Sequence, residues 1–150
     1  MPRFIANLSM LFTELPFLER FAAARQAGFR TVEVQFPYDP AAADIRHALV
    51  DAGVSLHLIN LPAGDWAGGD RGIAADPARV EEFRDGVAQA LAYAGELGVR
   101  HLNCLAGLGG TVGKDAQWQT LVANVRHAAA ALRALDATLL VEPINRRDVP

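Results

Sequence analysis

The fold is decided by units such as Leu97-Gly98-Val99-Arg100-His101-Leu102-Asn103-Cys104-Leu105, in which a helical segment ends at a glycine and an apolar strand follows at once. The same junction recurs at Ala27-Gly28-Phe29 and Ala52-Gly53-Val54, and Leu135-Asp136-Ala137 keeps it with Asp in place of Gly. Glycine suits the position after a helix because a positive φ carries no Cβ penalty there. The pattern predicts strands that alternate with helices, over residues 4–8, 31–36, 54–59, 99–105 and 137–142.

The helical segments have start signals and apolar stripes of their own. Asp39-Pro40 and Asp76-Pro77 each predict a helix start, because an N-cap acceptor precedes a proline that fits the first turn. In the last two segments apolar residues recur every three or four positions, which predicts that they are buried. These residues are Val80, Phe83, Val87, Leu91 and Ala94, and then Trp118, Leu121, Val125, Leu132 and Leu135.

Strands that alternate with helices predict βαβ units in a parallel sheet. Two α/β architectures fit: a doubly wound open sheet, and the N-terminal half of a (β/α)₈ TIM barrel, which needs about 250 residues when complete. Residues 9–16 lack the glycine fingerprint of a dinucleotide fold, and Gly107-Leu108-Gly109-Gly110 lacks the Lys-Ser/Thr of a phosphate loop. We therefore predict a half TIM barrel of about five parallel strands and four helices. Residues 1–150 would form a single incomplete domain without an internal boundary, and no nucleotide cofactor is expected.

Composition excludes several classes of partner. The 150 residues are 51% hydrophobic and 21% charged, which predicts a globular chain. The net charge of −3 and the absence of a Lys/Arg block argue against nucleic acid, and no stretch reaches the ~20 apolar residues of a membrane span. The single cysteine, Cys104, excludes an intramolecular disulfide and is expected to be a buried, inert thiol. With no signal peptide at the N-terminus, these features predict a cytoplasmic protein.

The stretch Leu139-Leu140-Val141-Glu142-Pro143-Ile144-Asn145 places a carboxylate at the end of an apolar strand. In parallel α/β folds the chemistry gathers at the carboxyl ends of the strands. A strand this apolar is expected to be buried on both faces, where a charge needs compensation. We predict that Glu142 is a metal ligand and a proton-transfer group. The alternative is a structural salt bridge to Arg146, Arg147 or another nearby base.

Further polar residues follow the other strands. Glu33 alternates with apolar neighbours within its strand, where a substrate contact and a structural hydrogen bond are both open. The connection from Asn60 to Asp76 is long for a βα loop, so Trp66 is a candidate to close over a ligand and Arg71 a candidate for a bidentate anion contact. The predicted substrate-binding residues are Asn7, Glu33, Asn60, Trp66, Arg71 and Asn145.

Five segments in this order resemble the hydroxypyruvate isomerase family of the xylose isomerase-like TIM barrels, and also the related 2-oxo-tetronate isomerases. They are residues 4–12, Pro16-Phe17-Leu18-Glu19-Arg20-Phe21, Phe36-Pro37-Tyr38, residues 60–66 and Glu142-Pro143-Ile144-Asn145. The resemblance implies aldose–ketose isomerisation of hydroxypyruvate to tartronate semialdehyde by two glutamates, with a divalent metal, Mg²⁺ or Mn²⁺. Glu142 matches the first glutamate, and the second lies in the C-terminal half, which this sequence lacks.

Three other functions are open. A ketose 3-epimerase would share the superfamily and take a sugar in place of a small hydroxy-keto acid. A metal-dependent DNA-repair endonuclease is disfavoured by the acidic charge and the lack of histidines at the strand ends. A non-catalytic half barrel is the remaining alternative. Since an open sheet exposes strand edges, we expect a homo-oligomer or a partner half barrel.

Overall fold

The computed structural model describes residues 4–108 and 111–145 and shows a parallel sheet of five strands. The strands lie in chain order, and each pairs in parallel with the next. They are β1 (Ala6–Asn7), β2 (Thr31–Val34), β3 (Ser55–Asn60), β4 (His101–Leu105) and β5 (Thr138–Glu142). The predicted α/β half barrel of five parallel strands is confirmed.

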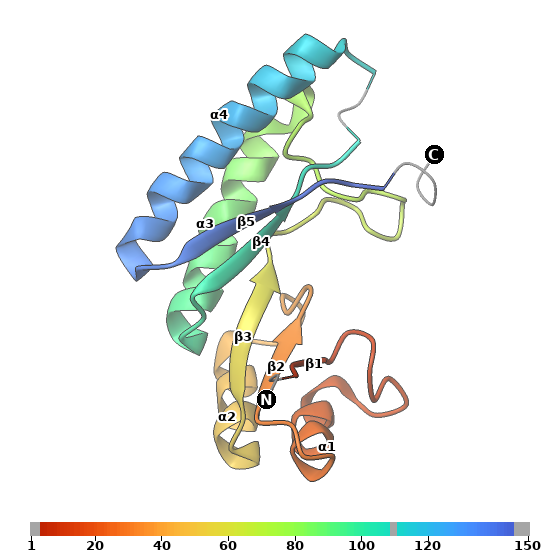
Figure 1. Cartoon of the computed structure of the whole chain (residues 1–150), viewed down its shortest axis with the longest axis vertical. Helices are drawn as coiled ribbons and strands as arrows, with labels where there is room; N and C mark the ends of the chain where they lie inside the picture. Colours follow the sequence, from red (N-terminus) through yellow and green to blue (C-terminus); the bar gives the residue numbers. More distant parts are fainter. Residues whose placement is uncertain (1–3, 109–110, 146–150) are drawn as a thin grey trace.

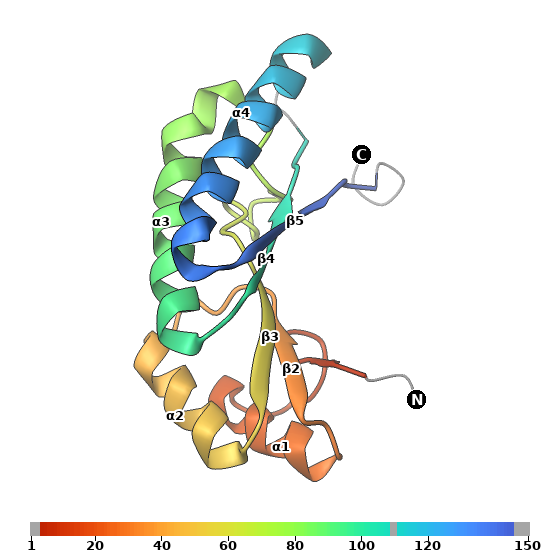
Figure 2. The same cartoon turned by 60° about the vertical axis from the view of Figure 1, so that its left-hand side comes forward.

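The helices cover one face of this sheet. They are α1 (Arg20–Gln26), α2 (Ala42–Ala52), α3 (Val80–Leu97) and α4 (Lys114–Leu132), with 3₁₀ turns η1 (Phe17–Glu19), η2 (Pro77–Arg79) and η3 (Arg133–Leu135) at their ends. Each helix contacts the next one in chain order (Figure 1). Figure 2 shows the helices on one side of the strands, and no described element covers the other side, called the open face below. No described helix is long and apolar enough to cross a membrane.

The core lies between the sheet and the helices. Val32 and Val34 of β2 are buried there against helix residues such as Phe21 and Ile45. Because side chains alternate along a strand, the residues between these valines project to the open face. Glu33 is accordingly half-buried between two fully buried neighbours. The same alternation orients polar residues of the other strands toward the open face.

The helix ends follow the predicted junctions. Gly53 and Gly98 are left-handed caps of α2 and α3, and Asp136 takes the same conformation at φ 50°. The side chain of Asp76 accepts a hydrogen bond from the Ala78 amide at 2.9 Å, as its N-cap position predicts. The predicted start at Asp39-Pro40 is wrong, since α2 begins at Ala42 without a side-chain cap. The hydroxyl of Tyr93 donates to the Pro40 carbonyl at 2.9 Å, which fixes this segment outside the helix.

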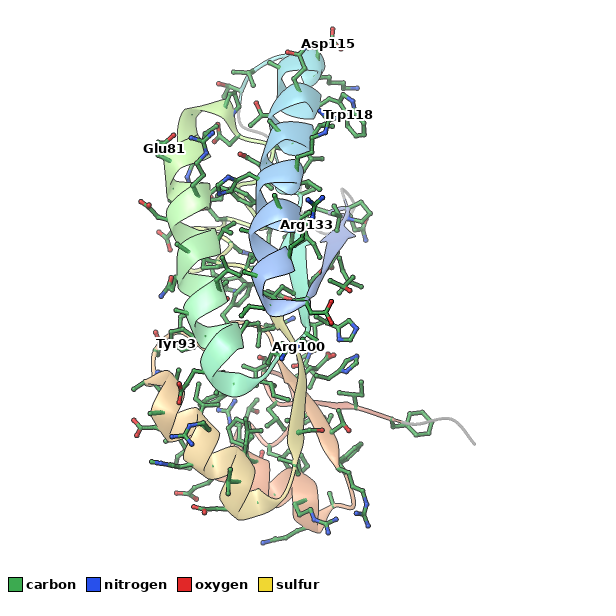
Figure 3. The ribbon with its side chains drawn as sticks, turned by 90° about the vertical axis from the view of Figure 1, so that its left-hand side faces the viewer. Glu81, Tyr93, Arg100, Asp115, Trp118 and Arg133 are labelled. Carbon is green, nitrogen blue, oxygen red and sulfur yellow. The ribbon has the colours of Figure 1, made fainter. Side chains whose placement is uncertain are left out.

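One member of the predicted apolar stripe on α4 is not in the core. Trp118 is 66% exposed, near the Asp115 end of the helix (Figure 3). The buried residues of α4, which include Ala128 and Leu132, all lie in its second half. The first turns of α4 therefore present Trp118 to solvent although its spacing fits the stripe.

Candidate active site

The open face forms a groove of about 380 Å³ at the carboxyl ends of the strands. Each of the five strands contributes to its lining, which includes Asn7, Glu33, Gln35, Leu58, Asn60, Asn103, Leu140 and Glu142. Four of these residues are predicted site residues, from β1, β2, β3 and β5: Asn7, Glu33, Asn60 and Glu142. The parallel register brings them together because all five strands end at the same edge.

The carboxylate of Glu33 is held by the neighbouring strand. Asn7 Nδ2 donates to Glu33 Oε1 at 2.9 Å, and Asn7 Oδ1 accepts the Ser9 amide at 2.9 Å. Register pairs these two residues directly, since Asn7 lies opposite Glu33 in the β1–β2 pair. The hydrogen-bonded amide therefore fixes where the Glu33 carboxylate lies in the groove, and the donor is neutral.

Glu142 is held in a similar way from β4. Asn103 Nδ2 donates to Glu142 Oε2 at 2.6 Å and to Asn60 Oδ1 at 3.2 Å. Asn60 is only 4% exposed, and its carbonyl oxygen accepts the hydroxyl of Tyr38. Burial raises the pKa of the Tyr38 phenol far above its usual value, and Tyr93 adds to this effect, so the hydroxyl remains a donor. The three side chains of Asn60, Asn103 and Glu142 form one hydrogen-bonded row across β3, β4 and β5.

The expected two-sided burial of the last strand is wrong. β5 is an edge strand of the sheet, packed by α4 on one face, and Leu140 and Val141 are 40% and 46% exposed. Glu142 is exposed too, so its charge needs no buried counterion. Arg146 and Arg147, the alternative partners of Glu142, lie outside the described residues.

Trp66 and Arg71 form a stack beside the groove rather than part of its lining. The Arg71 guanidinium carbon lies 4.1 Å from the centre of a Trp66 ring, and Trp66 packs on Phe36 at 5.0 Å between ring centres. Among the described residues, the hydrogen bonds of Arg71 both start from Nη1, to the carbonyls of Trp66 at 3.1 Å and Asp70 at 2.7 Å. Phe36 follows Gln35 directly, so the stack adjoins the groove.

The loop over residues 61–76, which contains this stack, is tied to the start of α3. Arg79 Nη1 lies 2.7 Å from Asp70 Oδ2, and Asp70 Oδ2 also accepts the Asp65 amide at 2.6 Å. Two further Arg79 nitrogens each donate to an oxygen of Glu82 at 2.7 Å. These bonds raise the pKa of Arg79 and lower that of Glu82. Arg79 therefore links Asp70 of the loop to Glu82 of α3, an arrangement called the Arg79 clamp below.

A second attachment of this loop explains Gly107, which follows β4. A Cβ on Gly107 would overlap the carbonyl of Gly72, and the Ala75 amide donates to the Ala106 carbonyl at 3.0 Å. The buried side chain of Asn124, on α4, donates to the Ala74 carbonyl at 2.9 Å. The absence of a side chain on Gly107 thus allows the loop of residues 61–76 to pack closely against the end of β4. Gly109 and Gly110 lie outside the described residues.

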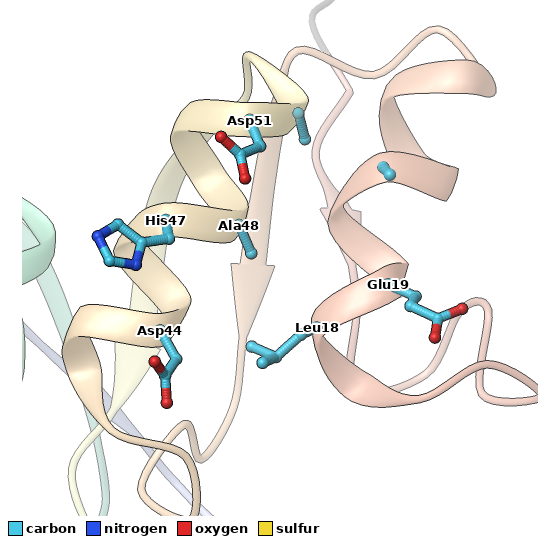
Figure 4. Close-up of a pocket in the computed structure, with 8 residues that line it drawn as sticks. Leu18, Glu19, Asp44, His47, Ala48 and Asp51 are labelled. Atoms are coloured by element: carbon cyan, nitrogen blue, oxygen red, sulfur yellow. The ribbon is translucent and has the colours of Figure 1, made fainter.

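A larger groove of about 470 Å³ lies elsewhere, on the helical side between η1–α1 and α2. Figure 4 shows that Glu19, Asp44, His47 and Asp51 surround it together with Leu18 and Ala48. None of the predicted site residues lines it. The site we consider is therefore the smaller groove on the open face.

Comparisons with known proteins agree with this geometry. The family model of the xylose isomerase-like TIM barrel matches residues 21–150. The chain belongs to this family. It is 52% identical to hydroxypyruvate isomerase of Escherichia coli and 47% identical to 2-oxo-tetronate isomerase of Cupriavidus necator, and it covers 58% of each of these relatives while being covered completely itself.

Solved structures show the same fold for this xylose isomerase-like chain. The crystal structure of an AP endonuclease of family 2 from Brucella melitensis superposes with a TM-score of 0.95 at 47% identity, over 100% of this chain and 58% of that one. A D-allulose 3-epimerase from Methylomonas sp., at 18% identity, matches 97% of this chain and 53% of that one with a TM-score of 0.73, which shows the fold alone. This chain spans little more than half the length of the relatives that it matches.

The described residues of this family member do not form a complete metal site. Within residues 4–108 and 111–145, no group of three or more His, Cys, Asp and Glu side chains could hold an ion. The carboxylates that line the groove, Glu33 and Glu142, come from β2 and β5, which are not adjacent, and each accepts a hydrogen bond from an asparagine. Glu142 is thus one possible oxygen ligand without a described set of partners.

The structure also shows whether two further residues, Asn145 and Asn103, lie at the groove. Asn145 is exposed and is not among the residues that line the groove. Asn103, which sequence reasoning missed, lies in the middle of the polar row. A signal for it existed: Asn103 is a polar residue inside an apolar strand, two positions after His101 and therefore on the same face.

Proposed function

We propose that this chain supplies the groove and one proton-transfer carboxylate of an isomerase that interconverts hydroxypyruvate and tartronate semialdehyde. The observation that supports this most directly is the Glu142 carboxylate, oriented by Asn103 at the groove, in a chain 52% identical to the E. coli hydroxypyruvate isomerase. The alternative substrate is that of a 2-oxo-tetronate isomerase, since a relative of that name is 47% identical.

The reaction needs a base beside the carbon that loses a proton. Hydroxypyruvate has a hydroxymethyl carbon next to its ketone. In our proposal Glu142 takes a proton from that carbon, and the electrons of the broken C–H bond form an enediolate. A proton then returns to the neighbouring carbon, the former ketone carbon. The hydroxyl proton of the original hydroxymethyl group passes to the former ketone oxygen, so that this carbon becomes the aldehyde and the ketone becomes a hydroxyl. A positioned carboxylate is a common general base for such a step. The proton-returning partner is the second glutamate implied by the family resemblance, outside this chain.

Binding of the substrate would involve the two neighbouring features of the site. Arg71, stacked on Trp66, is proposed to contact the substrate carboxylate, because a guanidinium matches a carboxylate with two parallel hydrogen bonds. Asn7, Asn60 and Asn145 are proposed contacts for hydroxyl and carbonyl groups, and Glu33 for a hydroxyl that donates to it. These roles stay predictions; Asn7, Glu33 and Asn60 line the same groove, which supports a shared role.

A divalent cation, Mg²⁺ or Mn²⁺, remains our proposed cofactor, with Glu142 as one of its ligands. The described residues do not complete such a site, so its other ligands would come from residues outside them. The proton transfer proposed above is therefore written without the ion.

The direct test is an assay of hydroxypyruvate isomerisation by this chain with Mg²⁺ or Mn²⁺, comparing the wild type with Glu142→Gln. A matched control is Glu96→Gln, which removes a carboxylate from a half-exposed surface pair with Arg46, neither of which lines the groove. Activity lost in Glu142→Gln and retained in Glu96→Gln would support the proposal. A folded chain without activity would instead favour a non-catalytic half barrel that needs a partner.

Two other functions can be tested on the same preparation. The Brucella AP endonuclease structure makes DNA repair the second candidate. The described lining of the groove contains two carboxylates and no Lys, Arg or His, which would repel a phosphodiester. Nicking of abasic duplex DNA would nevertheless establish the endonuclease. Activity on free ketohexoses, with no activity on hydroxypyruvate, would establish a ketose 3-epimerase.

We also propose that the open face has a partner, either a second copy or a partner half barrel. β1 and β5 are both strand edges, and Ile5 and Leu140 are 37% and 40% exposed at or near them. Such edges and apolar side chains favour association. Sedimentation equilibrium tests this, and a stable monomer would contradict it. A cytoplasmic location stays a prediction from the sequence, which has a single cysteine and no stretch long enough for a membrane span.

A further inference from the structure

We propose that Asn103 is a positioning residue for Glu142: it fixes the rotation of the carboxylate so that one oxygen is held by β4 and the other is available to the groove. The inference rests on the proposed function, in which Glu142 moves the proton. It adds a residue that does not itself react and assigns its task.

The strand register determines which residue can do this. Asn103 lies opposite Leu140, and Glu142 lies opposite Leu105, so Asn103 and Glu142 are diagonal neighbours on the same face of adjacent strands. The 2.6 Å contact from Nδ2 to Oε2 joins them. An ionised carboxylate accepts hydrogen bonds and cannot donate them, so Asn103 must present its amide nitrogen to it. This chemistry fixes the orientation of the amide.

The second hydrogen of the same amide is also engaged. Asn103 Nδ2 donates to Asn60 Oδ1 at 3.2 Å, and Asn60 is nearly completely buried. The backbone of Asn60 is itself held, because its amide donates to the Gln35 carbonyl at 2.8 Å and its carbonyl accepts the Tyr38 hydroxyl. The Asn103 amide thus joins the buried side chain of Asn60 to the exposed side chain of Glu142.

This arrangement matters because the Glu142 side chain is exposed. Its neighbours Leu140 and Val141 are 40% and 46% exposed, so packing of the described residues alone does not restrict the carboxylate. A hydrogen bond to an anchored donor limits its rotation instead. Proton abstraction from carbon requires a base held within a narrow range of positions, and a misplacement of about 1 Å can cost ~100-fold in rate.

The first test separates binding from turnover. Asn103→Leu keeps the size of the side chain and removes its donor, whereas Asn103→His places an N–H nitrogen at the same branch position. We expect kcat for hydroxypyruvate to fall by ~10- to 100-fold in Asn103→Leu with little change in KM, and to be partly restored in Asn103→His. Adding Asn103→Leu to Glu142→Gln should cause no further loss. Equal kcat in the wild type and Asn103→Leu, or a loss that adds fully to that of Glu142→Gln, would overturn the proposal.

The second test does not need turnover, so it applies even if the chain proves inactive and the proposed function fails. The side-chain amide protons of Asn103 are followed by ¹H–¹⁵N correlation spectra in the wild type, Glu142→Gln and the control His101→Gln, which lies two residues away on β4. We expect the Asn103 amide resonances to shift in Glu142→Gln far more than in His101→Gln. Asn103 resonances that shift no more in Glu142→Gln than in His101→Gln would refute the positioning role.

Discussion

The backbones of Gly72 and Gly107 touch: a Cβ on Gly107 would overlap the carbonyl group of Gly72, and a Cβ on Gly72 would overlap the carbonyl of Leu105. Both glycines have positive φ, 105° and 82°. This contact seats the loop of residues 61–76 against the end of β4, beside the groove. The position of Trp66 and Arg71 therefore depends on two residues that have no side chain.

We predict that Gly107→Ala destabilises the protein more than Gly98→Ala. Both residues have positive φ, which alone costs roughly 1–2 kcal/mol for a residue with a Cβ. Nothing lies within 4 Å of a Cβ on Gly98, so that variant measures the conformational cost only. The difference between the free energies of unfolding of the two variants, from urea denaturation, then reports the overlap with Gly72. Equal losses would show that the two backbones separate without cost.

The clamp at Arg79 leads to a second prediction, on the loop and on pH. Arg79→Gln should increase hydrogen exchange of amides in residues 64–72, because it frees Asp70 and Glu82 together. The control is Arg84→Gln, which breaks a pair with Glu81, whose side chain is 82% exposed. The global loss of stability should be no more than about 1 kcal/mol, since these pairs are partly solvated. Exchange that rises equally in both variants would contradict the clamp.

The pH dependence of this clamp has a definite sign. Arg79 lowers the pKa of Glu82 in the folded state, so the stabilisation is complete above the ordinary carboxyl pKa of about 4.3 and is lost as the pH falls through the lower folded value. The difference in exchange between the wild type and Arg79→Gln should therefore persist from pH 7 to about 5 and shrink below about 4. A difference that grows on acidification would be incompatible with this pairing.

The sequence predicts the parts of this site that depend on strand order alone. Asn7, Glu33, Asn60 and Glu142 each come near the end of an expected strand, and parallel strands place such ends along one edge. Alternation within β2 likewise predicts which face Glu33 occupies. These inferences need only the strands and their direction.

The remaining features depend on contacts between distant residues. Asn103 meets Glu142 because of the register between β4 and β5, which composition does not specify. The loop that carries the Trp66–Arg71 stack is held by Arg79 and by Gly107, which both lie outside the local sequence of the stack. The apolar composition of β5 also suggested burial, although an edge strand can be as apolar as a central one.

Cys104 should be unreactive in the folded protein. Burial raises the pKa of its thiol to about 12, so at pH 8 only about one molecule in 10⁴ is a thiolate. We expect a disulfide reagent such as 5,5′-dithiobis(2-nitrobenzoate) to modify the native chain very slowly and the chain in guanidinium chloride at once. Rapid modification without denaturant would mean that β4 opens readily, and it would argue against the rigid row through Asn103.

Metal binding is predicted to be weak and to depend on Glu142. The described residues contain no group of three potential ligands, so this chain should bind Mn²⁺ less tightly than a complete four- to six-ligand site. Electron paramagnetic resonance of Mn²⁺ gives the fraction bound, and Glu142→Gln should reduce it more than Glu96→Gln does. Tight Mn²⁺ binding that persists in Glu142→Gln would show that the ion binds to another part of the molecule.

The stack of Arg71 on Trp66 predicts how the chain distinguishes anions from neutral sugars. Tartronate, a dicarboxylate related to the proposed product, should bind the wild type and should bind Arg71→Met ~10- to 100-fold more weakly, the usual cost of a charged hydrogen bond. Trp66→Leu should weaken binding less, since it removes the support of the guanidinium and not its charge. Arg84→Met, which removes an exposed cation of α3, is the control. Calorimetric titration gives the dissociation constants, and equal values for Arg71→Met and Arg84→Met would exclude Arg71 as the carboxylate contact.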